Sequence, residues 1–242
     1  MITVAEALLL VLWSAIGQFL LGGILASAGP VGLTSAEVLF TGLPAIAAAR
    51  WRGGLPAIGI VRPRARTVAG AALVGATAWA FLGSVVLPLQ EKLIPTPQAL
   101  EEALRRAAAP NLAALVAVSV VPAICEELLF RGVLAPALDR RFGRVFAVVG
   151  SALVFAMCHG ALARFAPTFL LGCSYAAIAL AARTTVPTMV AHALNNGAVW
   201  LFAASPPLQE SFDAHLGLVA GMSAVALAAG HTLVFIRFPS TR

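Results

Sequence analysis

The chain has 242 residues, of which 60% are hydrophobic and only 11% charged, and its mean hydropathy is +0.94. Soluble domains carry about 25% charged residues, so this composition excludes a water-soluble globule. The net charge of +6 would suggest nucleic-acid binding in a soluble protein. Here most arginines lie in short connectors between apolar segments, where they fix orientation in a membrane and meet anionic lipid. We therefore expect a helical membrane protein that contacts the lipid bilayer and has no nucleic-acid partner.

Eight apolar segments follow one another along the chain, and most of them are about long enough to cross a hydrocarbon core of roughly 30 Å as helices. By residue number they are 5–28, 34–49, 67–88, 111–134, 145–159, 165–182, 185–204 and 215–236. The second is the least regular, because it is short and contains Glu37 and Pro44. We predict an all-α fold: a polytopic bundle of about eight transmembrane helices, forming a single membrane-embedded domain over residues 1–242.

The distribution of positive charge predicts how the chain lies in the cell membrane. Arginines follow the second, fourth, sixth and eighth segments, in the sets Arg50, Arg52, Arg62, Arg64 and Arg66, then Arg140, Arg141 and Arg144, then Arg183, then Arg237 and Arg242. Cytoplasmic loops carry an excess of Lys and Arg, so this bias places both termini in the cytoplasm and requires an even number of spans. Residues 98–109, with Glu102 and Arg106 at i, i+4 spacing, are predicted to form a short interfacial helix.

Three charged residues interrupt the fourth apolar segment, where charge costs free energy at bilayer depth. Glu127 and Arg131 are four residues apart, so they share a helix face and can form an ion pair. Glu126 points about 100° away and is left without that arginine, which suits a general base or acid. Pro122 is expected to kink this helix, and Pro136 to end it early.

Two later segments carry histidines among apolar residues. His159 ends the fifth segment, with Phe155 one turn earlier on the same face as packing that fixes the imidazole. His192 and Asn196 are four residues apart in the seventh segment, so two hydrogen-bonding groups converge within an apolar helix. A plainer interpretation is open for each: His159 as an interfacial or core histidine, and the His192–Asn196 pair as hydrogen bonds that join membrane helices.

Taken in order, the motifs Glu126-Glu127-x-x-x-Arg131, Phe155-x-x-x-His159 and His192-x-x-x-Asn196 resemble those of the CAAX-protease and bacteriocin-processing (CPBP) family of membrane proteases. The resemblance covers residues 112–204. It implies a glutamate-dependent, metal-independent intramembrane endopeptidase on an eight-helix fold, acting on a peptide or protein substrate at the membrane.

The resemblance also implies a role for each residue of the motifs. Glu126 and His159 would activate the attacking water, while His192 and Asn196 would stabilise the oxyanion. The residues that hold the site together would be Glu127, Arg131 and Phe155. Such roles fit amide hydrolysis, which needs a base for water, donors for the oxyanion and an acid for the leaving amine.

Three other functions remain open on the sequence. A zinc metalloprotease is one, because two histidines and a glutamate can bind zinc, although the His-Glu-x-x-His spacing is absent and we expect no cofactor. A proton-coupled transporter is another, although the chain shows no repeated halves. A noncatalytic immunity or scaffold protein of the same fold is the third. Cys125, Cys158 and Cys173 are expected to be small buried hydrophobes rather than disulfide or metal ligands.

Overall fold

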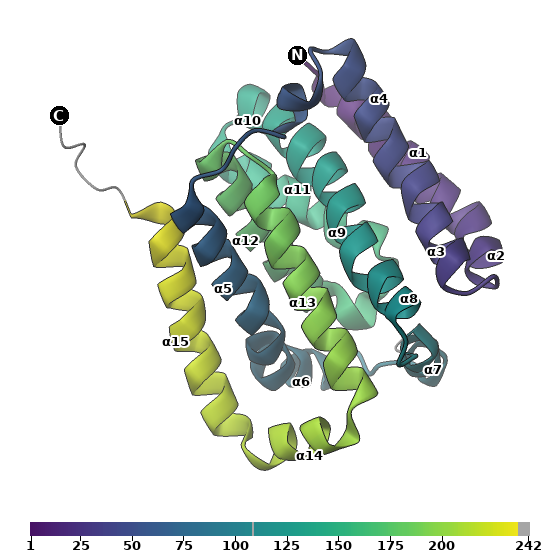
Figure 1. Ribbon diagram of the computed structural model, residues 1–242, viewed down its shortest axis with the longest axis vertical. Helices are drawn as coiled ribbons and strands as arrows, with labels where there is room; N and C mark the ends of the chain where they lie inside the picture. Colours follow the sequence, from purple (N-terminus) through teal and green to yellow (C-terminus); the bar gives the residue numbers. More distant parts are fainter. Residues whose placement is uncertain (108, 237–242) are drawn as a thin grey trace.

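The computed structural model describes residues 1–107 and 109–236, and all regular structure among them is helical (Figure 1). This confirms the predicted all-α class, and each of the eight predicted apolar segments forms a helix. Six helices in the described part are long and apolar enough to cross a membrane: Val4–Ala26, Pro30–Trp51, Ala65–Glu91, Leu112–Phe142, Leu162–Ala182 and Leu216–Phe235. By length and composition, the chain is a multi-pass membrane protein.

The remaining two predicted spans are shorter or more polar helices. Helix α11 (Arg144–Cys158) is apolar but has only 15 residues. Helix α13 (Val186–Ala204) has 19 residues, and its sequence includes a histidine and two asparagines. Among the described residues the fold therefore shows six candidate spans, which do not include α11 or α13.

Several long helices are continuous but change their winding along their length. Those of the N-terminal half are α1 (Val4–Gly17), η1 (Gln18–Gly22) and α2 (Gly23–Ala26), then α3 (Pro30–Glu37), η2 (Val38–Gly42) and α4 (Leu43–Trp51), then α5 (Ala65–Phe81), η4 (Leu82–Val86) and α6 (Leu87–Glu91). The fourth candidate span consists of α8 (Leu112–Leu115), η5 (Val116–Val120), α9 (Val121–Glu126), η6 (Glu127–Leu134) and α10 (Ala135–Phe142). In these spans the η segments are π-helical.

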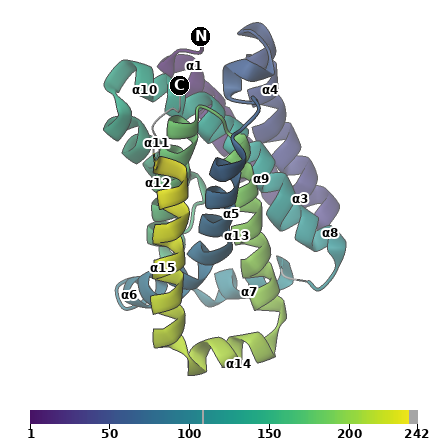
Figure 2. The same cartoon turned by 60° about the vertical axis from the view of Figure 1, so that its left-hand side comes forward.

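The other elements complete the bundle and its connections. They are the short 3-10 turns η3 (Leu55–Ile58) and η7 (Leu162–Arg164), and the helices α7 (Gln98–Ala107), α12 (Phe165–Ala182), α14 (Pro206–Ala214) and α15 (Leu216–Phe235). Helix α7 confirms the short helix predicted after the third span, and Arg106 pairs with Glu102 across 3.9 Å. Figure 2 shows α7 and α14 lying across one end of the long helices.

Prolines inside the spans are accommodated by π turns. The segments η2, η4, η5 and η6 each end two residues before a proline, namely Pro44, Pro88, Pro122 and Pro136. A helical proline lacks an N–H donor and clashes with the carbonyl four residues earlier. A π turn is wider, so it moves that carbonyl away from the ring. The prediction that Pro136 ends the span was therefore wrong, because the helix passes through η6 and continues to Phe142.

The helix carrying His192 is held close to α5. Helix α5 packs against both α13 and α15, and α11 packs against α12. The α5–α13 contact requires Gly75, because a Cβ atom there would lie 2.0 Å from the backbone oxygen of Ala191. Since Ala191 directly precedes His192, this backbone contact fixes the position of the histidine's helical turn.

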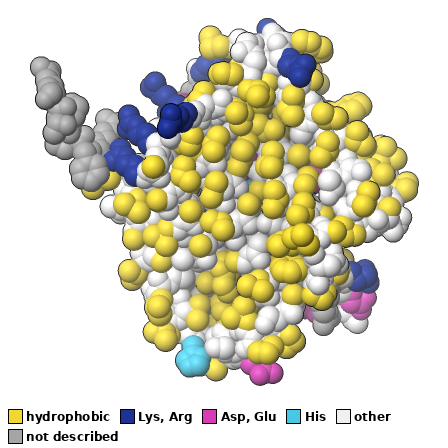
Figure 3. Space-filling model, in the orientation of Figure 1, with side chains coloured by type: hydrophobic (Ala, Val, Ile, Leu, Met, Phe, Trp, Pro, Cys, Tyr) yellow, Lys and Arg dark blue, Asp and Glu magenta, His cyan; other side chains and the backbone are white. Residues whose placement is uncertain are grey.

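The surface has the polarity of a membrane protein. Large apolar side chains are exposed, with Phe19 86%, Val145 77% and Val225 71% accessible, which a protein in water would not tolerate in such number. Figure 3 shows apolar side chains spread over the middle of one face, with most of the visible Lys and Arg towards the end where the chain begins. Helix α15 returns to that same end (Figure 1), whereas the predicted cytoplasmic Arg237 and Arg242 lie outside the described residues.

Candidate active site

Glu126 and Glu127 lie at the junction where α9 ends and η6 begins. Glu127 is fully buried, and its Oε1 lies 3.0 Å from Nη1 of Arg131, which is also buried. The predicted i, i+4 ion pair is thus present in the structure. Because loss of either partner would leave an uncompensated charge in an apolar core, the pair holds this segment in place. The wide π turn begins at the second glutamate, and such turns are frequent at functional sites.

His192 connects the two glutamates. Its side chain is buried, its Nδ1 lies 3.0 Å from Oε1 of Glu127, and its Nε2 lies 3.7 Å from Oε2 of Glu126. The two nitrogens lie on different edges of the imidazole, so one side chain on α13 reaches two carboxylates that leave their own helix in different directions. An ionised carboxylate only accepts, so His192 Nδ1–H donates to Glu127.

The charges of this cluster balance when the histidine is protonated. Glu126 and Glu127 contribute two carboxylates, and Arg131 contributes one positive charge. The cluster is electrically neutral when His192 carries both of its ring protons. In a low-dielectric interior, a neutral cluster is much cheaper than one with a net charge. In that state Nε2–H of His192 is a hydrogen-bond donor.

His159 caps the C-terminus of α11, where Gly160 with φ 66° turns the chain away from the helix. Its Nδ1 lies 2.9 Å from the carbonyl oxygen of Phe155, and the two rings meet edge to face at 4.6 Å. The predicted packing of Phe155 on His159 is therefore present. A carbonyl only accepts, so Nδ1 carries the proton, and the Nε2 of the neutral ring is left as an acceptor.

A cavity of about 220 Å³ joins these helices. Its walls are formed by Ser14, Ala15, Gln18, Glu37, Thr41, Glu126, Phe130, Cys158 and His159. The volume is several times the roughly 30 Å³ that one water molecule occupies in the liquid. The structure thus places Glu126 and His159, from α9 and α11, on the wall of one space that can hold water and part of a substrate.

Asn196 lies one helical turn beyond His192. Its Nδ2 donates to the backbone carbonyl of Val118 at 3.3 Å, and its Oδ1 accepts from Asn195 at 3.2 Å. It is not among the described residues that line the cavity. One N–H of the amide is left for another acceptor. Of the four residues predicted to be catalytic, the structure brings together Glu126, His159 and His192, whereas the amide of Asn196 is hydrogen-bonded to Val118 and Asn195.

Two aromatic rings surround Arg131, and sequence reasoning missed one of them, Tyr175, as a neighbour of Arg131. Its guanidinium carbon lies 4.2 Å from the centre of the Phe155 ring and 5.6 Å from that of Tyr175. Tyr175 is buried on α12, and its ring lies 5.6 Å from that of His192. It is the only tyrosine of the chain and sits in an apolar segment, which is the signal that was overlooked. These rings stabilise the buried cation from the sides that Glu127 does not cover.

The cysteines differ from the uniform burial expected. Cys125 is buried, Cys173 is half-buried, and Cys158 is exposed and lines the cavity. Cys158 directly precedes the helix cap, where fewer neighbours cover a side chain than in the helix interior.

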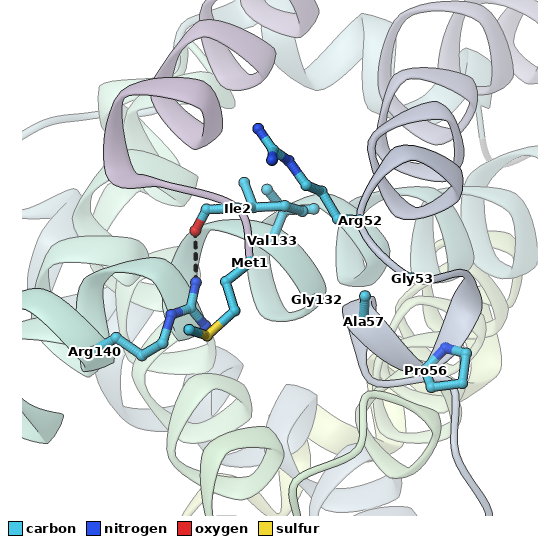
Figure 4. A pocket seen from close by; sticks show the side chains of 9 residues that line it. All are labelled: Met1, Ile2, Arg52, Gly53, Pro56, Ala57, Gly132, Val133 and Arg140. Atoms are coloured by element: carbon cyan, nitrogen blue, oxygen red, sulfur yellow. Dashed lines mark hydrogen bonds between the residues drawn. The ribbon is translucent and has the colours of Figure 1, made fainter.

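A second and larger cavity, of about 370 Å³, contains none of the predicted site residues. Figure 4 shows it between Met1, Ile2, Arg52 and Arg140, where Arg140 donates to the carbonyl oxygen of Ile2 at 2.6 Å. Within the described part of the chain, no group of three or more His, Cys, Asp or Glu side chains is arranged to hold a metal ion. Glu126 and His159 instead line the smaller cavity, and His192 contacts Glu126 beside it.

Residues 108–198 match the family model for type II CAAX prenyl endopeptidase Rce1-like proteins. This segment is an Rce1-like domain of the CPBP family. All the predicted site residues, from Glu126 to Asn196, lie inside it, which confirms the resemblance found in the motifs. No match was found among curated protein sequences or among solved structures.

The Rce1-like segment forms only part of the cavity wall. Four of the nine lining residues lie inside 108–198, among them Glu126 and His159. The other five come from the first two candidate spans, outside the matched segment. The N-terminal helices therefore complete a space whose proposed hydrolytic groups come from the family segment.

Proposed function

We propose that this protein is an intramembrane endopeptidase that hydrolyses a peptide bond in a membrane-associated or lipidated substrate, without a metal ion. The main support is that Glu126 and His159, both inside the Rce1-like segment, line one cavity of about 220 Å³. The contact of His192 with Glu126 adds a donor next to the proposed base.

Glu126 is the proposed general base. It is half-buried and lines the cavity, so its carboxylate can accept from a water molecule there, while its buried Oε2 lies on the side of His192, 3.7 Å from Nε2. His159 supplies a second acceptor, its Nε2, because its Nδ1–H is held by the carbonyl of Phe155. Two acceptors on one water leave its oxygen lone pair free to attack the scissile carbonyl, and a positioned base contributes about 10²–10⁴-fold to the rate.

His192 and Asn196 are the proposed donors to the oxyanion of the tetrahedral intermediate. Protonated His192 offers Nε2–H, and Asn196 offers the amide N–H that Val118 does not use. In a site with little water, such fixed donors stabilise developing negative charge much more strongly than they would in bulk solvent.

Glu127, Arg131 and Phe155 are positioning residues in this proposal. Glu127 orients His192 through Nδ1 and is itself held by Arg131. Phe155 packs on both His159 and the guanidinium of Arg131. One aromatic ring thus contacts the base side and the oxyanion side of the site, so that neither moves independently.

The orientation in the membrane is part of the same proposal. Eight crossings by one membrane-embedded domain would place both termini in the cytoplasm, with the arginine-rich loops. The return of α15 to the end where α1 begins is consistent with an even number of crossings (Figure 1). Fusions of a reporter active only in the cytoplasm to each terminus should both be active, and one inactive fusion would contradict the topology.

The test of activity compares membrane proteomes of cells that express the intact protein, Glu126→Gln or Glu210→Gln. Glu210 is exposed on α14, so its substitution makes the same chemical change away from the cavity. We expect peptide products in cells with the intact protein and Glu210→Gln, and none with Glu126→Gln. Equal peptide profiles in all three, at equal expression, would exclude the peptidase. Loss of cleavage on addition of a chelator would point instead to a metal enzyme.

A further inference from the structure

A second carboxylate, besides that of Glu126, faces the cavity, and it comes from outside the Rce1-like segment. Glu37 ends α3 and lines the cavity together with Glu126 and His159. An acidic side chain within a membrane span is costly, and where one persists it commonly has a function. In the sequence, Glu37 was notable only as a charged residue within the second apolar segment.

Glu37 has polar neighbours on the cavity wall, and one of its two oxygens accepts a hydrogen bond from them. Gln18 donates from Nε2 to Oε1 of Glu37 at 2.9 Å. Oε2 of Glu37 is buried and has no hydrogen-bond partner. Beside them, the hydroxyls of Ser14 and Thr41 lie 2.8 Å apart and complete a polar wall from two helices. The side chain is therefore fixed in place on the cavity wall, with one oxygen atom that Gln18 does not hold.

The charges around the cavity favour a neutral Glu37. Glu126 lines the same small space, and two carboxylates there repel one another when both are ionised. The cavity wall contains no Lys or Arg among its described residues. Arg131 is already paired with Glu127. A neutral carboxylic acid avoids the repulsion and gains an O–H donor, and Oε2, which Gln18 does not hold, is the oxygen that can carry the proton.

We propose that Glu37 is the general acid of the reaction, which gives its proton to the departing amine while Glu126 takes a proton from the attacking water. This inference rests on the proposed peptidase activity. A bond forms between the water oxygen and the carbonyl carbon, and the C–N bond then breaks. The amine leaves with the proton of Glu37. Glu126, now protonated, returns a proton to Glu37 through water in the cavity, which restores both groups.

A separate acid has a geometric advantage over a single glutamate that takes and returns the proton. Glu126 and Glu37 come from different helices, α9 and α3, that face one cavity. A substrate bound between them would meet the base on one side and the acid on the other. Both proton transfers would then proceed without movement of a side chain between water and amine.

The test uses a peptide copied from a cleavage site found in the proteome comparison, made once with the scissile amide and once with an ester at that bond. The leaving group of an ester is an alkoxide, and its departure depends much less on a general acid than the departure of an amine does. We expect Glu37→Gln to cleave the amide at least about 10²-fold more slowly, but the ester less than about 10-fold more slowly. Glu126→Gln should lose both activities, and Glu210→Gln should keep both.

Glu37→Gln keeps the carbonyl oxygen that accepts from Gln18, so a melting temperature close to that of the intact protein is expected. Equal losses on amide and ester, or undiminished amide cleavage, would overturn the role of Glu37 while leaving the peptidase in place. If the intact protein and Glu126→Gln are equally inactive on both peptides, the peptidase itself fails.

A second measurement does not depend on turnover. Infrared spectra of the purified protein at neutral pH should show the carbonyl band of a protonated carboxylic acid. We expect Glu37→Gln to lose this band and the exposed control Glu210→Gln to keep it. A band that persists in Glu37→Gln would assign the proton to another carboxyl group and overturn the inference.

Discussion

Nδ1 of His192 lies 3.0 Å from Oε1 of Glu127, the same oxygen that pairs with Arg131. One buried carboxylate therefore serves two cationic or donor groups from different parts of the chain. Its neighbour Glu126 shares neither of these two short contacts, and its Oε2 lies farther from the histidine, 3.7 Å from Nε2 of His192. The two adjacent glutamates thus have different surroundings, because Glu127 lies in the buried ion pair and Glu126 lines the cavity.

Because of this difference, the same substitution of glutamate by glutamine should affect stability at one position and activity at the other. Glu127→Gln should destabilise the protein by about 3–5 kcal/mol, because it leaves Arg131 without its counter-charge in the core. Glu126→Gln should leave the melting temperature nearly unchanged and abolish peptide cleavage. Thermal unfolding in detergent, followed for both variants and the intact protein, measures the first effect. A stable Glu127→Gln protein would show that Arg131 is compensated by some other group.

Asn196→Ala should lower kcat by about 10²–10³-fold with little change in KM, because an oxyanion donor acts in the transition state rather than in substrate binding. Steady-state kinetics on the amide peptide provide the measurement. A higher KM at constant kcat would show that Asn196 binds substrate instead. In the alternative of helix-joining hydrogen bonds alone, the melting temperature would fall without a specific loss of kcat.

Gly75→Ala should destabilise the fold and reduce activity, because the added methyl would lie 2.0 Å from the Ala191 oxygen and push α13 away from α5. The matched control is Gly221→Ala in α15, where an added Cβ meets nothing within 4 Å. The control should be neutral or slightly stabilising, since alanine is the better helix former by about 0.8–1.0 kcal/mol. Equal melting temperatures for the two variants would contradict the close packing at Gly75.

Cys158 provides a chemical probe of the cavity. It is an exposed cysteine that lines this space, whereas Cys125 is buried and Cys173 is half-buried. A small thiol-specific reagent should therefore inactivate the intact protein, and Cys158→Ser should be active and resistant. Mass spectrometry of the labelled protein identifies the modified residue. Full activity after complete modification of Cys158 would show that substrate does not enter this cavity.

Local spacing accounts for the features that were predicted correctly. The hydropathy located all eight helical segments, because a backbone in lipid must satisfy its hydrogen bonds internally. The ion pair of Glu127 with Arg131 and the packing of Phe155 on His159 both follow from residues one turn apart on one helix. The expectation that proline ends a helix was wrong at Pro136, because the chain accommodates the proline with a π turn and the helix continues.

The sequence by itself determined the class of the protein, its helical segments and the motifs of its family, because composition and i, i+4 spacing act within single helices. Only the tertiary structure decided that His192 contacts both glutamates and that Glu37 joins Glu126 and His159 around one cavity. These contacts depend on how each helix is rotated and how closely it approaches its neighbours. Backbone contacts such as Gly75 against Ala191 set that approach, and nothing in the spacing along one helix specifies it.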